Sequence, residues 1–277
     1  MSAAMDADVT SPTNALVKRL VKLRERRTRE REGVFVVEGA RELTRAVQAG
    51  WNLDVLATCP ELHSPDATEA AGRLHEAARD TRRFGVQAFA RASVRQNPDG
   101  LMGVVRMRRV ALDDLPWPAG ACYLVIAGLE KPGNVGALLR TASAAAVEAV
   151  FVTHAGTDLG NPNVVRASMG SLFSLPVLTL SDELLRAALE ARGVRLVTTT
   201  PTARTTYWDA DLSGTIAIVV GPEHEGLDAA WRDAADVEVG IPMAGAVDSL
   251  NAAASGALVL FEVVRRRRLR SADPPRP

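Results

Sequence analysis

Short apolar runs in the second half of the chain alternate with segments that have helical periodicity. The run at 216–220 (Ile-Ala-Ile-Val-Val) contains no polar side chain, and similar runs lie at 122–127 and 149–153. Continuous apolar strands between amphipathic helices are typical of a parallel sheet that helices cover on both faces. The pattern therefore predicts an α/β domain from residue 121 to about residue 270.

In this second half the same periodicities predict strands and helices with stated bounds. The predicted strands are 122–127, 149–153, 176–180, 195–199, 215–220 and 237–241. The predicted helices are 135–146, 164–172, 182–192, 227–235 and 249–268. Repeated strand–helix units in this order favour a sheet whose ligands bind beyond the carboxyl ends of the strands.

Residues 14–112 predict a second, smaller α/β domain. Leu16, Leu20 and Leu23 have helical spacing, with Lys and Arg between them, which predicts an amphipathic basic helix from Asn14. Strands and helices then alternate. The predicted elements are strand 34–38, a helix through Ala46, strand 53–57, helix 67–79, and short strands near Gln87 and at 102–110.

The remaining segments are small, polar or rich in Pro. Residues 1–13 predict a disordered tail, and residues 271–277 a second tail. Residues 113–120 contain Pro116 and Pro118 and predict a linker. The chain therefore divides into residues 14–112 and residues 121–270, which suits its length of 277 residues.

Composition indicates an ordinary globular protein of a reducing compartment. Hydrophobic residues make up 47% and charged residues 24%. The start of the chain predicts no signal peptide, and the longest clean apolar run, 119–129, is shorter than the ~20 residues of a membrane span. Cys59 and Cys122 have no neighbouring His or Cys, so we expect structural thiols, no metal and a cytoplasmic location.

Charge is unevenly placed although the net charge is zero. Between Lys18 and Glu32 there are eight Lys or Arg against three Glu, and the end of the chain carries Arg at 265–268 and 270. Such basic segments indicate a nucleic-acid partner. The spacing alone is equally typical of a solvated helix face, and both interpretations stay open at this point.

Three polar segments follow strands of the second half. They are Asn-Val-Gly-Ala-Leu-Leu-Arg-Thr at 134–141, Gly-Pro-Glu-His-Glu-Gly at 221–226, and Ile-Pro-Met at 241–243 followed by Ser-Leu-Asn at 249–251. Because the carboxyl ends of parallel strands meet at one edge, the three segments predict the rim of one pocket. The segments contain no catalytic Cys, metal-ligand cluster or phosphate loop, and no Gly-x-Gly-x-x-Gly follows the first strand.

Together these motifs resemble the SpoU/TrmH family of RNA ribose 2′-O-methyltransferases, in the SPOUT superfamily. The similarity runs from about Tyr123 to Glu262, and a weaker likeness at 35–43 resembles the family's L30e-like substrate-binding domain. The resemblance implies S-adenosylmethionine as cofactor, an RNA partner, a homodimer and a trefoil knot in the second domain. Topology rules alone would predict an unknotted sheet, so the knot is expected from the resemblance only.

The resemblance also implies roles for residues of the three motifs. The expected cofactor-binding residues are Thr199, Thr200, Gly221, Ile241 and Leu250. The expected catalytic residues are Arg140, Asn134, Glu223, Ser249 and Asn251. Helix capping is the alternative explanation for Ser249, and a favourable charge at a helix start is the alternative for Glu223.

Arg140 is the residue expected to contribute most to catalysis. A guanidinium keeps its proton because its pKa lies above ~12, so it is a poor general base. We therefore expect Arg140 to bind the target phosphate and to stabilise the developing alkoxide. Glu223 or Asn251 would then hold Arg140, position the nucleotide or contact the cofactor.

The function expected is methyl transfer from S-adenosylmethionine to a ribose 2′-hydroxyl of rRNA of the 23S type. The expected RNA-binding residues are Lys18, Arg26, Arg27, Arg41 and Arg166. One alternative is a tRNA 2′-O-methyltransferase, which the additional N-terminal domain disfavours. Another is a non-catalytic RNA-binding or ribosome-assembly factor with the same fold, which would have no need for the full set of motif residues.

Overall fold

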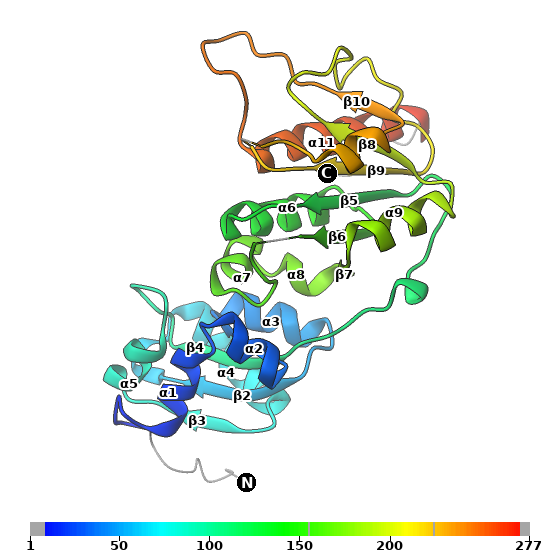
Figure 1. Cartoon of the computed structure of the whole chain (residues 1–277). Helices are drawn as coiled ribbons and strands as arrows, with labels where there is room; N and C mark the ends of the chain where they lie inside the picture. Colours follow the sequence, from blue (N-terminus) through cyan, green and yellow to red (C-terminus); the bar gives the residue numbers. More distant parts are fainter. Residues whose placement is uncertain (1–8, 155, 224, 272–277) are drawn as a thin grey trace. The chain divides into compact units, whose positions relative to one another are not determined.

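The computed structural model describes residues 9–154, 156–223 and 225–271, and it divides into two compact units (Figure 1). Unit 1 joins the chain up to residue 108 with residues 158–174, and unit 2 contains residues 109–157 and the chain from residue 175 onward. Residues 1–8 and 272–277, which belong to the expected tails, lie outside the described residues, as does His224.

Unit 1 contains a four-stranded sheet in the order β1-β4-β2-β3. Its strands are β1 (Val34–Glu38), β2 (Leu53–Thr58), β3 (Thr81–Arg83) and β4 (Leu101–Arg106). β4 runs antiparallel to β1 and β2, with Val104 opposite Val36, and β2 pairs in parallel with β3. The predicted small α/β domain is thus present.

Short helices surround this sheet. They are α1 (Ala15–Lys22), α2 (Arg26–Glu32), α3 (Ala40–Gln48), α4 (Pro65–Ala77), α5 (Val86–Ala92), α7 (Pro162–Ser168) and α8 (Ser171–Ser174). The Asn14 side chain caps α1 by accepting from Leu16 N at 2.8 Å, and Ser64 caps α4 in the same way. Apolar residues of α1 and α5 form one buried cluster with the sheet, including Leu20 and Phe89.

Three expectations for this region are wrong. The basic helix breaks at 23–25, so its charged residues are divided between α1 and α2. The strand expected near Gln87 is helix α5, because Ala88, Phe89 and Ala92 have helical spacing and are buried on one face. Residues 9–13, expected in the tail, include a buried Val9 whose backbone pairs with Arg83 and Gly85.

Unit 2 contains a six-stranded, all-parallel sheet in the order β10-β8-β9-β5-β6-β7. Its strands are β5 (Cys122–Ala127), β6 (Ala149–Thr153), β7 (Val177–Thr179), β8 (Arg195–Thr199), β9 (Ile216–Val220) and β10 (Val237–Val239). β5 and β9 are buried at every position and lie at the centre of the sheet. The parallel sheet expected from the apolar runs is confirmed.

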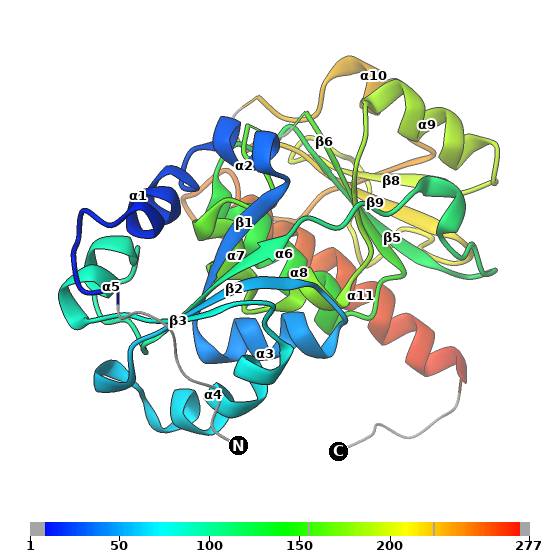
Figure 2. The ribbon, with the colours of Figure 1, turned by 90° about the horizontal axis from the view of Figure 1, so that it is seen from below.

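Helices cover both faces of this sheet. α6 (Pro132–Ala144) and α11 (Ala252–Ser271) pack against each other on one face, and α9 (Asp182–Glu190) and α10 (Ala229–Asp233) lie on the other (Figure 2). Leu185 of α9 and Trp231 of α10 join the buried cluster of the second face. Several predicted bounds are wrong. α6 begins at Pro132 rather than 135, α11 begins at Ala252 rather than Ser249, and the helix expected at 164–172 divides into α7 and α8 at Met169.

Candidate functional site

A pocket lies at the carboxyl ends of β8, β9 and β10 in unit 2. Its empty volume, including the part open to solvent, is about 530 Å³. The residues that line it come from the ends of these strands, from the three loops that follow them and from the start of α11. They are Thr199, Thr200, Pro201, Val220, Gly221, Pro222, Glu223, Val239, Ile241, Met243, Asp248, Ser249, Leu250, Ala252 and Ser255.

All five residues expected to bind the cofactor line this pocket. Thr199 and Thr200 follow β8, Gly221 follows β9, Ile241 follows β10, and Leu250 precedes α11. The Thr199 hydroxyl donates to Val219 O at 3.1 Å, and Thr200 N donates to Val239 O at 3.0 Å. These bonds join the ends of the three neighbouring strands and hold the rim of the pocket in place.

A packing contact explains why a glycine stands at position 221. A Cβ at this position would lie 2.7 Å from Cδ2 and 2.9 Å from Cγ of Leu227, which is buried. The glycine therefore makes room for Leu227. The pocket wall at Gly221 is backbone, which leaves main-chain groups available for recognition.

Glu223 is the centre of a hydrogen-bonded cluster beside the pocket. Its Oε1 accepts from Asn134 Nδ2 at 2.9 Å, from Asn251 Nδ2 at 2.9 Å and from Ala252 N at 3.2 Å. Its Oε2 accepts from Lys131 Nζ at 3.1 Å. Asn251 Nδ2 also donates to Asn134 Oδ1 at 2.9 Å. One carboxylate thus connects residues of all three motifs.

The charge of Glu223 is stabilised by these partners. Its pKa is lowered from the usual value, first by the hydrogen bond from the Ala252 backbone N–H and next by the one from Lys131. The side chain is 17% exposed, whereas the Lys131 side chain is 66% exposed. Lys131 was not among the predicted site residues. Its position directly before Pro132 and the first motif is the sequence signal that could have identified it.

The local contacts of the other motif residues follow from this cluster. Asn134 lies within α6, which begins two residues earlier, and its side chain donates to Glu223. Ser249 lies before the start of α11, where Asn251 Oδ1 accepts from Ala253 N at 2.9 Å in the manner of a cap. Within the described residues, Glu223 and Asn251 bond each other and Asn134, and neither contacts Arg140.

Arg140 lies apart from this cluster. It is exposed on α6, six residues after Asn134 and therefore about 120° round the helix from it. Among the described residues of the chain, no hydrogen-bond or ion-pair partner of Arg140 is found. Its guanidinium is thus available for a group that the single chain does not supply.

The residues expected to bind RNA lie in unit 1 and are exposed. Lys18 is on α1, Arg26 and Arg27 are on α2, Arg41 is on α3 and Arg166 is on α7. Arg26 forms an ion pair with Glu30 at 2.7 Å. One further cation of the basic segment, Arg29, is buried and pairs with Asp158, so this residue does not belong to the exposed basic surface.

The described residues contain neither a metal-binding group nor a membrane-spanning helix. Across residues 9–154, 156–223 and 225–271, no group of three His, Cys, Asp or Glu side chains could hold a metal ion. In the same part of the chain, no helix is long and apolar enough to cross a membrane. Both cysteines are free thiols in buried positions, and burial raises the pKa of Cys122 to about 12.

Comparison with known proteins identifies both halves of the chain. Residues 121–261 match the SpoU rRNA Methylase family, and residues 14–103 match an MRM3-like substrate binding domain. The chain belongs to the SpoU rRNA methylase family. The predicted family, the α/β fold class and the expectation of an RNA methyltransferase are thereby confirmed.

Individual relatives match over nearly the whole chain. The 23S rRNA (uridine(2479)-2′-O)-methyltransferase of Streptomyces viridochromogenes is 30% identical over 88% of this chain and 87% of its own length. A crystal structure of an RNA 2′-O ribose methyltransferase is 41% identical, with a TM-score of 0.84, and covers 94% of this chain and 99% of its own. The AdoMet-bound rRNA methyltransferase from Sinorhizobium meliloti is 28% identical, with a TM-score of 0.85, over 94% and 98% of the two chains.

Proposed function

We propose that this protein transfers the methyl group of S-adenosylmethionine to a ribose 2′-hydroxyl of rRNA. The observation that carries the proposal is the meeting of the three motifs. Seven residues of the second and third motifs line one pocket, and Glu223 bonds Asn134 of the first motif and Asn251 of the third. The relatives that are named for a ribosomal substrate are 23S rRNA 2′-O-methyltransferases, which favours rRNA over tRNA.

The site suits a reaction that needs positioning more than acid–base chemistry. The methyl carbon leaves a sulfonium and forms a bond to the ribose oxygen, whose proton is released, while the sulfur becomes a neutral thioether. Holding the two reactants in near-attack geometry supplies several kcal/mol of such a barrier. Thr199, Ile241 and Leu250 would hold the cofactor, while the Glu223 cluster would fix the substrate side of the pocket.

We further propose that the protein acts as a homodimer in which Arg140 reaches the pocket of the partner subunit. Arg140 is exposed and lies on α6, away from the Glu223 cluster of its own chain. The neighbouring helix α11 exposes Leu258 by 39% and Phe261 by 48%, one turn apart, and a second subunit would cover such an apolar face. The knotted topology, the cytoplasmic location and the lack of a metal requirement stay predictions.

The test of the proposed function is a comparison of total RNA from cells with and without the gene. Mapping of 2′-O-methyl positions should reveal one ribosomal position that loses its methyl group, and the purified protein should restore it with S-adenosylmethionine. The restored methylation should continue in EDTA. A lost methyl group in tRNA would favour the alternative substrate, and loss at no position would favour the non-catalytic alternative.

A further inference from the structure

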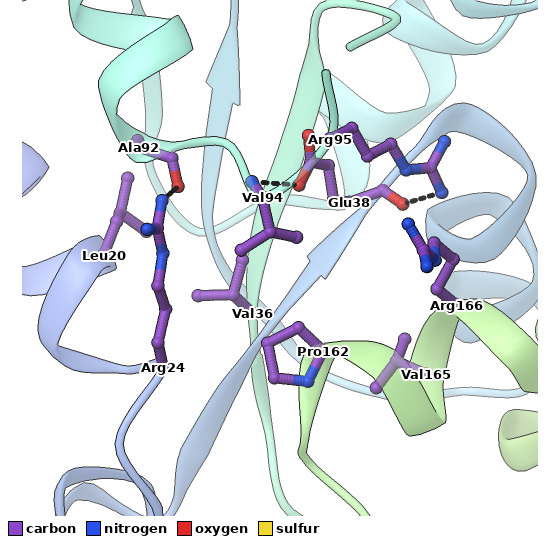
Figure 3. A pocket seen from close by; sticks show the side chains of 10 residues that line it. All are labelled: Leu20, Arg24, Val36, Glu38, Ala92, Val94, Arg95, Pro162, Val165 and Arg166. Carbon is purple, nitrogen blue, oxygen red and sulfur yellow. Dashed lines mark hydrogen bonds between the residues drawn. The ribbon is translucent and has the colours of Figure 1, made fainter. Parts of the chain in front are cut away.

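A second groove lies in unit 1, between α1, β1, the loop after α5 and α7 (Figure 3). Its empty volume, including the part open to solvent, is about 390 Å³. Apolar side chains form its floor, and arginines lie at its ends. The lining residues are Leu20, Arg24, Val36, Glu38, Ala92, Val94, Arg95, Pro162, Val165 and Arg166.

The groove has an ordered frame that its own residues maintain. Glu38 is buried, and its carboxylate accepts from the Ser93 hydroxyl and from Val94 N at 3.0 Å. Arg95 Nη2 donates to Glu38 O at 2.6 Å and pairs with Glu42 at 3.3 Å. Both carboxylate oxygens of Glu38 thus accept hydrogen bonds from the loop after α5, and these bonds fix the loop. Val94 of this loop is 41% exposed in the groove.

Gly39 is required for this frame. Its φ of +116° disfavours other residues, and a Cβ there would lie 2.5 Å from Glu42 Oε2 and 2.7 Å from Arg95 Nη2. The glycine thus lets the Arg95 guanidinium lie against the backbone beside β1. Glu38 and Gly39, which lie in the segment 35–43 that resembles the substrate-binding domain, therefore help to shape this groove.

Cationic groups occupy both ends of the groove. Arg24 lies at one end, where its Nη2 donates to the carbonyl oxygens of Ala92 at 2.9 Å and Ser93 at 2.8 Å (Figure 3). Its Nε is buried and has no hydrogen-bond partner among the described residues. Arg95 and Arg166 lie at the other end, and Arg166 is exposed. Three arginines line the groove against the carboxylates of Glu38 and the neighbouring Glu42, so the groove has a net positive charge.

We propose that this groove binds an unpaired nucleotide of the RNA substrate, with the base against Val36 and Val94 and the flanking phosphates on the arginines. An apolar floor between cations matches the apolar faces of a base between two phosphates. Seven of the ten lining residues lie within 14–103, the segment that matches a substrate binding domain. The proposal rests on the proposed function and adds the place where the N-terminal half contacts its RNA.

The test uses two variants of groove residues and two matched controls on the same surface. Val94→Asp places a carboxylate in the groove. Its control, Val86→Asp, places one at an exposed position of α5 that does not line the groove. Arg166→Ala removes a cation from the groove, and Arg91→Ala removes an exposed one from α5. Affinity for a transcript of the organism's 23S rRNA is measured by filter binding from low to high salt, with calorimetry for S-adenosylmethionine.

Val94→Asp is expected to weaken RNA binding on the order of tenfold or more, as one lost base contact would. Arg166→Ala should also weaken it and reduce the slope of log affinity against log salt by about 0.7, as expected for one phosphate contact. Both controls should stay within about twofold of the unchanged protein, and all four variants should keep its melting temperature and cofactor affinity.

Equal effects of the groove variants and their controls would overturn the groove as a binding site. Loss of affinity for Arg166→Ala but not for Val94→Asp would also overturn it, because Arg166 would then belong only to a general electrostatic surface. A transcript containing 4-thiouridine should cross-link to peptides carrying residues 86–95 or 162–168, and cross-links confined to other segments would also refute the proposal. If the unchanged protein neither binds S-adenosylmethionine nor methylates the transcript, the proposed function has failed, independently of the groove.

Discussion

Lys131 tunes the ionisation of Glu223, which holds the three motifs together. Because partners lower the pKa of Glu223, the cluster is intact above the usual carboxyl range and is lost as the pH falls through the lowered value. Lys131→Met removes the second-largest of these causes, so the carboxylate should take up its proton at higher pH. Carbon-13 NMR of labelled Glu measures this midpoint. An unchanged midpoint would mean that the Ala252 N–H and the two Asn side chains suffice.

Arg140→Ala should separate catalysis from cofactor binding. If Arg140 contacts the substrate oxygen or phosphate, methyl transfer should fall by ~10² or more, the scale of one lost oxyanion donor, with S-adenosylmethionine affinity nearly unchanged. Arg140→Lys should also fail, because an ammonium does not reproduce the planar guanidinium fork. Single-turnover rates and calorimetry measure both quantities. Arg232→Ala, an exposed cation on α10, is the control, and equal losses of rate and cofactor affinity would contradict the assignment.

At the residue scale, the sequence predicted which positions meet but not which atoms bond. Thr199, Gly221 and Leu250 line one pocket because each stands at the end of a strand or the start of a helix, which apolar runs reveal. The bond from Lys131 to Glu223 joins residues 92 apart in the chain. Periodicity contains no information on such pairs, so the bonds of Glu223 to Lys131, Asn134 and Asn251 were not predicted.

At the element scale, strands were predicted better than helix ends. Four strands, at 34–38, 122–127, 149–153 and 195–199, have the predicted bounds, since each contains a short run of apolar or β-branched residues. The start of α11 was misplaced because Ser249 and Asn251 are both good capping residues. Only the tertiary bonds of Asn251 to Glu223 and Asn134 decide between them.

Glu262 binds two arginines of α11, one of which also binds the loop before β9. It accepts from Arg265 at 2.7 Å and from Arg266 at 2.6 Å, and Arg266 Nη1 also donates to Ala210 O at 2.6 Å. These bonds, chiefly that from Arg265, hold the pKa of Glu262 at about 2, below the usual 4.5. Glu262→Gln should therefore lower the free energy of unfolding at pH 7 by about 1–3 kcal/mol.

The pH dependence of this loss follows from the lowered pKa. The contribution of the Glu262 carboxylate is complete above pH 4.5 and disappears as the pH falls towards 2. Urea unfolding at pH 7 and melting temperatures between pH 7 and pH 3 should show the variant and the unchanged protein converging on acidification. Glu190→Gln, on the exposed face of α9, is the control and should be near neutral. A constant difference down to pH 3 would refute the electrostatic explanation.

At the scale of the whole molecule, unit 1 is built from two separate stretches of chain. Phe173 of α8 stacks on Phe35 with the ring centroids 6.3 Å apart, and Trp51 Nε1 donates to Phe173 O at 3.1 Å. The predicted bounds, 14–112 and 121–270, assumed contiguous domains. Apolar spacing in 164–172 shows that one face is buried, but it does not show which element covers that face. The association of 158–174 with the N-terminal half was therefore beyond prediction.

Arg29 and Asp158 connect these two stretches through a buried ion pair. Arg29 is 1% exposed, and its Nε donates to Asp158 Oδ1 at 2.9 Å while Nη1 donates to Leu23 O at 2.9 Å. Removing one partner leaves the other charge unpaired in a buried position. Arg29→Ala and Asp158→Asn should each lower the free energy of unfolding by about 3–5 kcal/mol, because the remaining charge loses its compensation.

A double-mutant cycle separates the pair from other losses. The double variant should be less destabilised than the sum of the single variants, because no unpaired charge then remains, and the coupling should be at least ~1 kcal/mol. Arg26→Ala is the matched control, since its pair with Glu30 is more than half exposed and should contribute under ~0.5 kcal/mol. Urea unfolding measures the four proteins of the cycle and the control. Additive losses from Arg29→Ala and Asp158→Asn would show that the two stretches associate without this contact, and that the aromatic cluster of Phe35, Trp51 and Phe173 is sufficient to hold them.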